Sequence, residues 1–483
     1  MNTKMMGRFI AQIVAIEAVF MIPALVISLG YGEWPAVKAF AITLGIMLAL
    51  AGGLYGLCRR AEKIFGAQEG LVCVSLSWIV MSLLGALPFT LCGQVPNYID
   101  ALFEIISGFT TTGASVIADV EGLFKGILYW RSFTHWIGGM GVLVFLLAIL
   151  PGGNGAGFTM HLLRAESPGP DVGKLVPKMR QTAMILYVIY IVLTIVNIVF
   201  LLCGGMHWLH ALCTAFGTAG TGGFGVFNDS MTSVSPYIQN VTTVFMFLFG
   251  INFSCYYLVL IGKLRSIFKD EELRLYMGLA VGCVIALVLS IRPLYATLEE
   301  TIRHAAFQVS SIMTTTGYTT TDYDLWPAFS KAILLLLMIV GACAGSTGGG
   351  LKCIRLLLLF KVLRRNIRQI LNPRKVLVVR SNDKVVDEKV LANTNAYFAA
   401  YVIIIVICTL ILSLDGFNLE TNLSAALATF NNIGPGMGAV GPTCNFAAYG
   451  VLSKLTMCLA MLAGRLEIFP ILVLFSRSTW KRK

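Results

Sequence analysis

The chain has 483 residues, of which 57% are hydrophobic and only 12% carry a charge, and its mean hydropathy is +0.80. Because a soluble domain carries about 25% charged residues, this composition excludes a surface that mainly faces water and predicts a chain that mostly contacts lipid or other apolar helices. The net charge of +12 would suit nucleic acid, but the basic residues collect in alternate loops, so we expect no nucleic-acid partner.

The basic loops indicate how the chain is oriented in the bilayer. Short loops that are rich in Lys and Arg face the cytoplasm, and both termini belong to this basic set. We therefore expect both termini to be cytoplasmic. The basic positions of this set are Lys4, Arg8, Arg59, Arg60, Lys63, Arg164, Lys174, Lys178, Arg180, Lys263, Arg265, Lys269, Arg274, those within the run 352–389, Arg477, Lys481, Arg482 and Lys483.

Ten apolar stretches approach the length of about 20 residues that a membrane span needs. They cover residues 8–29, 36–58, 71–92, 127–150, 181–203, 237–261, 275–292, 328–363, 396–414 and 451–475. The first stretch exceeds the core of a signal peptide and no cleavage site follows it, so we interpret it as a retained span. Glu17 lies within this stretch and is interpreted as a packing or dimer residue.

Four shorter, half-apolar segments lie between spans on the outer side, and their lengths suit re-entrant half-helices. They cover residues 98–110, 207–218, 301–314 and 421–431. A glycine follows each segment, at Gly113, Gly220, Gly317 and Gly434, with separations of 107, 97 and 117 residues. The pattern predicts a fourfold internal repeat of span, half-helix, glycine turn and span.

The predicted fold class is therefore an all-α polytopic membrane protein with four pseudo-fourfold repeats around one central pore. Two N-terminal spans lie outside these repeats. The expected division is residues 1–62 for the two N-terminal spans, 63–165 for repeat 1, 166–265 for repeat 2, 266–392 for repeat 3 with its interrupted second span, and 393–483 for repeat 4.

The four glycine turns have the chemistry of a cation filter. A half-helix that enters from outside directs its partly negative C-terminus at the membrane centre, and the carbonyl oxygens that follow can replace the water shell of an ion. Glycine adopts the unusual backbone angles that such carbonyls demand. The expected filter residues are Thr110, Thr111, Thr112, Gly113, Gly217, Thr218, Ala219, Gly220, Thr314, Thr315, Thr316, Gly317, Asn431, Asn432, Ile433 and Gly434. Potassium contacts are expected at Thr111, Thr112, Thr218, Ala219, Thr315, Thr316, Asn432 and Ile433.

The alternative interpretation is that each glycine only caps a short helix. A single TTTG sequence would favour that alternative. Four aligned copies, each after a half-helix on the outer side, favour the filter.

One predicted span is interrupted by small residues between Gly341 and Arg355. Each glycine would destabilise a continuous helix by roughly 1 kcal/mol, so we expect an intramembrane loop that acts as a gate. The expected gate residues are Gly345, Ser346, Thr347, Gly348, Gly349, Gly350 and Arg465. Arg465 lies mid-way along the last span, where an unpaired charge is costly, and we expect it to donate to carbonyls of this loop. The alternatives are a glycine face for tight helix packing and a purely structural arginine.

The basic segment 363–389 contains KVLVVRS and KVVDEKV around Asn382 and Asp383, which predicts a small hairpin. Two interpretations of its charge stay open. It can lie near anionic lipid, or it can form a docking surface for an acidic cytosolic partner.

No pattern in the chain predicts an enzyme. Gly436, Gly438 and Gly441 match G-x-G-x-x-G, but no strand precedes them and no helix of a nucleotide fold follows. The twelve Cys show no paired spacing, so neither a disulfide framework nor a zinc site is expected.

The repeats resemble those of the Trk/Ktr/HKT superfamily of potassium transporters, and the two leading spans and the loops are most similar to the bacterial TrkH/TrkG members. The resemblance covers essentially the whole chain. It implies potassium uptake across the bacterial inner membrane, a homodimer with one pore per subunit, and a cytosolic nucleotide-binding regulatory subunit of the TrkA type. The ligand it implies is the potassium ion, without an organic cofactor on this chain.

The resemblance also bears on ion preference. Plant relatives with Ser at the first filter position prefer sodium, so Gly113 implies potassium. Two of the four filter segments, the second and the fourth, depart from the TTTG sequence, which leaves rubidium and sodium as further ions. A symporter that couples potassium to protons or sodium is the alternative function, and a membrane enzyme or scaffold is a third class. The pore repeats offer no obvious acid for coupling, which favours a gated pore.

Overall fold

The computed structural model describes residues 3–59, 67–141 and 179–480. Several expected features lie outside these residues. They are the repeat boundaries at 62/63 and 165/166, the second part of the span expected at 127–150, and the basic residues Arg60, Lys63, Arg164, Lys174, Lys178, Lys481, Arg482 and Lys483.

The described residues are mainly helical, with one pair of two-residue strands. In chain order, the elements are α1 (Thr3–Gly30), α2 (Trp34–Leu57), α3 (Ala67–Gly85), α4 (Leu87–Leu91), α5 (Tyr98–Phe109), α6 (Lys125–Gly139), α9 (Met179–Cys203), α10 (Trp208–Gly220), α11 (Pro236–Phe249), α12 (Phe253–Leu260), α13 (Leu264–Phe268), α14 (Glu271–Ile291), η1 (Arg292–Leu294), α15 (Leu298–Met313), η2 (Tyr323–Leu325), α16 (Ala328–Val340), α17 (Cys353–Leu371), β1 (Arg380–Ser381), β2 (Lys384–Val385), α18 (Glu388–Leu412), η3 (Ser413–Asp415), α19 (Leu419–Phe430), η4 (Gly438–Val440), α20 (Val451–Arg465), α21 (Phe469–Phe475) and α22 (Arg477–Trp480).

Long apolar helices dominate this fold. Within the described residues, six helices are long and apolar enough to cross a membrane, and seven if the bent pair α11 and α12 counts as one span. The all-α membrane fold expected from the composition is therefore confirmed. Glu17 of α1 is fully buried inside the chain, against Gly85 of α3, which favours a packing role over a surface contact.

The four expected half-helices are present as α5, α10, α15 and α19. Polar side chains begin three of them, because they accept a hydrogen bond from a free N–H of the first turn. Asn97 accepts from the Ile99 N–H at 3.0 Å. Thr297 and Asn418 cap α15 and α19 in the same way.

Two spans that were expected to be continuous are broken. Residues 237–261 form α11 and α12, which meet at 89°. The break follows from Asn252, whose side chain accepts from the Ser254 N–H at 2.9 Å and so starts a new helix.

The last expected span, 451–475, is also broken, into α20 and α21. Glu467 and Ile468 have positive φ angles of 62° and 63°, which no α-helix accommodates. Pro470 lies in the first turn of α21, where its missing N–H costs nothing.

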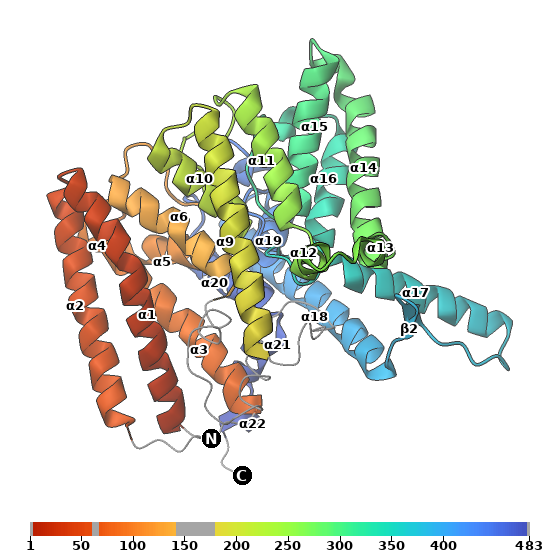
Figure 1. Ribbon diagram of the computed structural model, residues 1–483, viewed down its shortest axis with the longest axis horizontal. Coiled ribbons are helices and arrows are strands. Elements are labelled where there is room, and N and C mark those ends of the chain that lie inside the picture. The colour runs from red at the N-terminus through yellow and green to blue at the C-terminus, as the bar shows by residue number, and fades with distance from the viewer. Residues whose placement is uncertain (1–2, 60–66, 142–178, 481–483) are drawn as a thin grey trace.

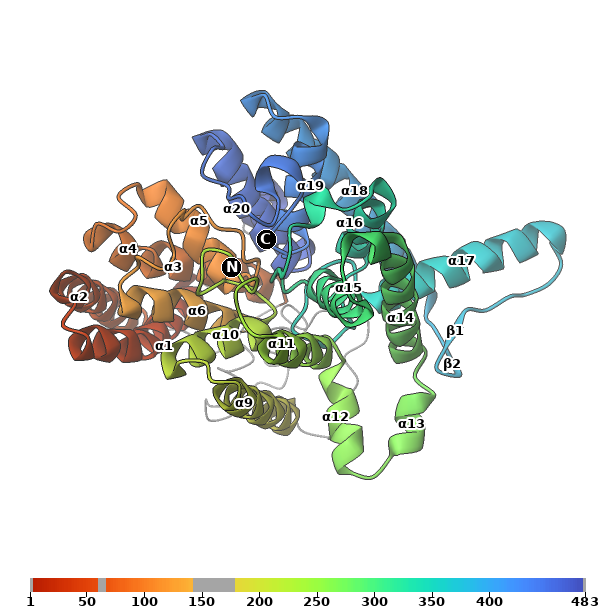
Figure 2. The same ribbon diagram turned by 90° about the horizontal axis from the view of Figure 1, so that it is seen from above.

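The repeating elements surround one centre in chain order. Figure 2 shows α5, α10, α15 and α19 around the middle of the molecule, each with longer helices outside it. The helices α1 and α2 pack side by side at one edge, outside this ring of elements (Figure 1).

The helix α17 and the strands β1 and β2 project from the opposite side of the body (Figures 1 and 2). The hairpin expected around Asn382 and Asp383 is present, with positive φ at both residues. It is shorter than expected, because α18 already begins at Glu388.

Candidate functional site

Each half-helix ends in the same kind of turn. In all four, an N–H that follows the helix donates to a carbonyl five residues earlier, and two residues nearby have positive φ. The bonds are Thr112 N to Ser107 O, Gly222 N to Gly217 O, Thr316 N to Ser311 O and Ile433 N to Ala428 O, all at 2.8 Å. The positive φ angles are those of Thr111, Thr221, Thr315 and Asn432 and, two positions later, of Gly113, Gly223, Gly317 and Gly434.

We call each of these turns, with the glycine that follows it, a wall. The second wall differs from the sequence-based alignment by three residues. The turn was expected at Gly220, but α10 continues through Gly220 and ends with Thr221 in the left-handed conformation. The expected wall residues Gly217, Thr218 and Ala219 are therefore helical. The corresponding wall is Gly220, Thr221 and Gly222, followed by Gly223.

The four turns contact one another in a closed ring. A methyl group added to the glycine of one wall would overlap or crowd the carbonyl oxygen of the next wall, and the fourth wall meets the first. The distances would be 1.9 Å from Gly113 to Gly222 O, 1.8 Å from Gly223 to Thr316 O, 2.0 Å from Gly317 to Ile433 O and 2.8 Å from Gly434 to Thr112 O. Every ring position therefore requires glycine, both for its φ and for the approach of a neighbouring backbone.

A pocket of about 130 Å³ lies against this ring. All four ring glycines line it, together with polar residues that follow each turn. Its further lining includes Ser115, Asn228, Thr319, Arg131 and Asn445. The ring glycines are thus accessible from a polar space on the side where the half-helices begin.

Two threonine hydroxyls pair with each other in the first wall, and two do so in the third wall. Thr110 Oγ1 donates to Ile106 O at 2.6 Å and lies 2.7 Å from Thr112 Oγ1. Thr314 and Thr316 form a matching pair at 2.8 Å. The threonines therefore stabilise the turns and add no charge to them.

The fourth wall uses asparagine amides instead. Asn432 Nδ2 donates to Thr112 Oγ1 and to Met461 O, both at 3.0 Å. Asn431 Nδ2 donates to the Tyr401 hydroxyl at 2.9 Å. The asparagines that stand in place of threonines in this wall therefore link it to the first wall and to α18 and α20.

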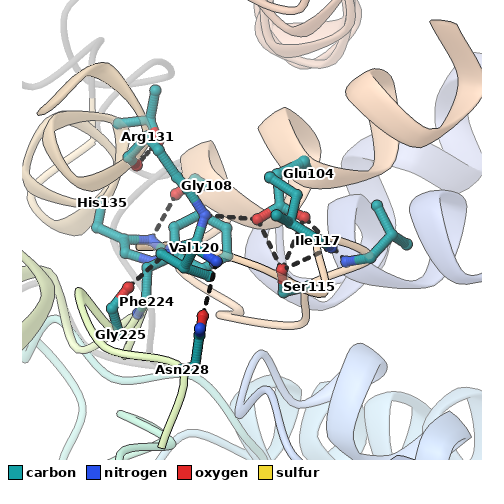
Figure 3. A network of polar contacts seen from close by, with 12 residues as sticks. Glu104, Gly108, Ser115, Ile117, Val120, Arg131, His135, Phe224, Gly225 and Asn228 are labelled. Atoms are coloured by element: carbon teal, nitrogen blue, oxygen red, sulfur yellow. Dashed lines mark hydrogen bonds and ion pairs between the residues drawn. The ribbon is translucent and has the colours of Figure 1, made fainter. Parts of the chain in front are cut away.

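A buried ion pair joins the first two walls (Figure 3). Arg131 Nε donates to Glu104 Oε1 at 2.5 Å, and both side chains are almost fully buried. Arg131 Nη1 also donates to Gly225 O at 3.0 Å, and its guanidinium carbon lies 3.5 Å from the centre of the Phe224 ring. A buried charge is tolerated only when paired and hydrogen-bonded, so this pair fixes α6 against both turns.

The same network continues on either side of the ion pair. Glu104 also accepts from Ser115 Oγ and from the Val116 N–H, which follow the first turn. His135 Nδ1 donates to Gly108 O at 2.8 Å, while its Nε2 accepts from the Phe224 N–H at 3.3 Å. Sequence reasoning missed this network, although charged residues within apolar helices were a signal that partners must exist.

The expected interruption between α16 and α17 is present, and it lies against two walls. The Gly349 N–H donates to Thr315 Oγ1 at 2.6 Å, and a methyl group on Gly349 would lie 2.3 Å from Asn431 O. Positive φ angles of 67° and 78° at Gly345 and Gly350 form the bends of this loop.

The other expected loop residues are packed around these bends. Ser346 Oγ donates to Cys343 O at 2.6 Å, and Thr347 Oγ1 donates to Phe249 O at 3.2 Å. A methyl group on Gly348 would lie 2.9 Å from Thr314 O. The loop therefore fits closely against the third wall and against α11.

Arg465 makes the expected hydrogen bond to this loop. Its Nη1 donates to Thr347 O at 2.8 Å. Its Nη2 also donates to Gly138 O at 2.5 Å and Gly139 O at 2.7 Å, which was not expected. One guanidinium therefore links the loop to the end of α6.

Two further charged residues near the loop were not recognised from sequence. The Lys352 ammonium is buried and donates to Gly348 O within the loop. Glu467 forms an ion pair with Arg355 of α17, whose guanidinium also lies over the Tyr397 ring. Glu467 thus has a partner other than its sequence neighbour Arg465.

The comparison with known families agrees with this geometry. A family model described as TrkH, a cation transport protein, matches residues 36–482. The chain belongs to this family. The family expected from the repeats is thereby confirmed.

Several members of the TrkH family resemble the chain over its full length. A Trk system potassium uptake protein TrkH from Salmonella typhimurium is 35% identical, and a Trk system potassium uptake protein TrkG from Escherichia coli is 34% identical; each alignment covers 100% of both chains. The crystal structure of the potassium transporter TrkH from Vibrio parahaemolyticus matches with a TM-score of 0.89 at 32% identity and covers 100% of both chains.

Proposed function

We propose that this chain takes up potassium through a filter formed by the four glycine turns, with rubidium and sodium as further ions. The names of its relatives support the ion. The observation that carries the proposal is the closed ring, in which each wall lies against the next and the fourth against the first. Main-chain oxygens in such a ring can replace the hydration shell of a monovalent cation.

The proposed ion contacts are main-chain oxygens, since the hydroxyls of Thr110 and Thr112 pair with each other, as do those of Thr314 and Thr316. The second wall takes its corrected position. The contacts are those of Thr110, Thr111, Thr112, Gly220, Thr221, Gly222, Thr314, Thr315, Thr316, Asn431, Asn432 and Ile433, each set followed by its ring glycine.

The loop Gly345–Gly350 and Arg465 form the proposed gate. The loop lies against the third and fourth walls, and the positive charge of Arg465 beside it disfavours a cation at the same place. Flux then requires the loop and the Arg465 side chain to move together, because Arg465 holds the Thr347 carbonyl.

The projecting helix α17 and the hairpin after it form the proposed cytosolic docking surface. Its partner is a nucleotide-binding regulatory subunit of the TrkA type, in keeping with the system for which the relatives are named. The basic residues of α17, among them Arg364, Arg365 and Arg368, suit an acidic surface on that partner.

The proposal extends to the oligomeric state, the membrane topology and the division into repeats. The chain forms a homodimer in the bacterial inner membrane with both termini cytoplasmic, and its repeats divide as expected from the sequence. The order of α5, α10, α15 and α19 around one centre supports that division (Figure 2).

Reconstitution into liposomes tests the proposal. We expect radioactive rubidium uptake that potassium competes with most strongly and lithium least. Uptake that depends on a proton or sodium gradient would instead establish a coupled symporter. Vesicles that take up no more rubidium than protein-free vesicles would overturn potassium transport altogether.

A further inference from the structure

Glu272 lies in the first turn of α14, is 6% exposed, and makes an unusual pair of contacts. A single atom, Oε1, accepts from the Ala344 N–H at 2.6 Å and from the Ile354 N–H at 3.1 Å. Ala344 directly precedes Gly345, where the loop begins, and Ile354 lies in the first turn of α17, just after the loop. One carboxylate oxygen therefore contacts both ends of the glycine-rich loop.

These contacts are not needed to cap α14. The cap of that helix is Asp270, whose side chain accepts from the Leu273 N–H at 2.9 Å. The neighbouring Glu271 faces another way, towards Lys361 of α17 and the N–H of Asn382 in the hairpin. Asp270 and Glu271 therefore have partners elsewhere, and Glu272 is the acidic residue of this turn that contacts the ends of the loop.

Backbone bonds already join the two arms of the loop to each other. The Leu351 N–H donates to Ile339 O at 3.2 Å, and the Cys353 N–H donates to Ala342 O at 3.0 Å. The base that they close is also bonded to the bend between α11 and α12, where the Cys343 N–H donates to Gly250 O at 3.1 Å and the Phe253 N–H donates to Gly345 O at 3.0 Å. Glu272 attaches that base to a separate span.

We propose that Glu272 is the positioning residue that fastens both ends of the loop to α14 and so holds the loop against the filter walls. The proposal rests on the gate described under the proposed function. Two hydrogen bonds to one oxygen atom restrain both arms together, and they depend on an acceptor at this distance along the side chain. Release of Glu272 frees the loop to leave the walls.

Three substitutions separate the hydrogen bonds from the charge. Glu272→Ala removes the acceptor. Glu272→Gln keeps an oxygen at the same distance along the side chain but is neutral, and Glu272→Asp keeps the charge but is shorter by one methylene group. Glu271→Ala is the matched control, because it alters the same helical turn without touching the loop.

The first readout is independent of transport. Cys343 and Cys353 flank the loop and are 1% and 0% exposed, so N-ethylmaleimide should label them slowly in the native protein. We expect peptide mass spectrometry to find labelling of both about tenfold faster in Glu272→Ala and Glu272→Asp, and near the native rate in Glu272→Gln and Glu271→Ala. Cys73 of α3, also buried, should keep its slow rate in every variant.

The second readout is resting rubidium flux in liposomes, which should rise in the same two variants and not in the others. Unchanged labelling in Glu272→Ala would overturn the proposal, as would faster labelling of Cys73 together with the loop cysteines, which indicates general unfolding. Equal effects of Glu271→Ala and Glu272→Ala would also overturn it. If the native protein carries no rubidium, the transport proposal fails while the labelling experiment still decides the role of Glu272.

Discussion

Replacement of Arg465 is the most direct test of the gate. Arg465→Ala removes, among its bonds to the described residues, those to Gly138 O, Gly139 O and Thr347 O, and the bond to Thr347 O at 2.8 Å holds the loop itself. A hydrogen bond to a charged group contributes about 1.5–3 kcal/mol. If that bond exists only when the loop is closed, its loss shifts the equilibrium towards the open state by roughly 10- to 150-fold. We therefore expect resting rubidium flux to rise within that range until the open state predominates.

The assay compares initial rubidium uptake per molecule of reconstituted protein, with monodispersity in detergent as the check on folding. Arg465→Lys should give an intermediate flux, because one ammonium group cannot reach three carbonyls as a guanidinium does. Thr456→Ala alters a half-buried residue of the same helix and should leave the flux unchanged. A well-folded Arg465→Ala protein with native resting flux would refute the gate.

Three further outcomes are expected. Gly317→Ala should abolish rubidium uptake, because the methyl group would lie 2.0 Å from a carbonyl of the fourth wall, whereas Gly278→Ala, with nothing near the added group, should transport normally. Arg131→Ala leaves a buried carboxylate unpaired and should lower the free energy of unfolding by about 3–5 kcal/mol, measured as thermal stability in detergent, while Glu299→Ala, at an exposed carboxylate, should change it by less than about 1 kcal/mol. Asn432→Ala removes two amide hydrogen bonds of the fourth wall and should weaken discrimination between potassium and sodium in competition uptake more than it weakens stability.

Local sequence features were sufficient to predict the half-helices and the interrupted span. Residues such as Asn97 begin a half-helix through their own side chains, and the glycines between Gly341 and Gly350 oppose a continuous helix. These effects depend on residues that are close together in the chain, so they can be predicted from the sequence. The bend after α11 also has a local cause, at Asn252. The apolar residues on either side of Asn252 nevertheless led to the prediction of one continuous span.

The second wall could not be positioned from sequence because several glycines follow Phe216 closely. The spacing to an apolar residue selected Gly220, whereas the packing against the third wall requires the left-handed conformation at Gly223. Long-range pairing was equally hidden. Glu467 finds Arg355 across the fold, and no short-range rule connects two residues so far apart in the chain.

The construction of the ring from one polypeptide has a consequence for how such a protein can change. In a channel assembled from four identical subunits, one codon change alters every side of the opening at once. Here Thr112, Gly222, Thr316 and Ile433 occupy equivalent positions with three kinds of residue. A single nucleotide substitution thus modifies one quarter of the proposed filter, whose ionic preference can then drift in small, separately selectable steps.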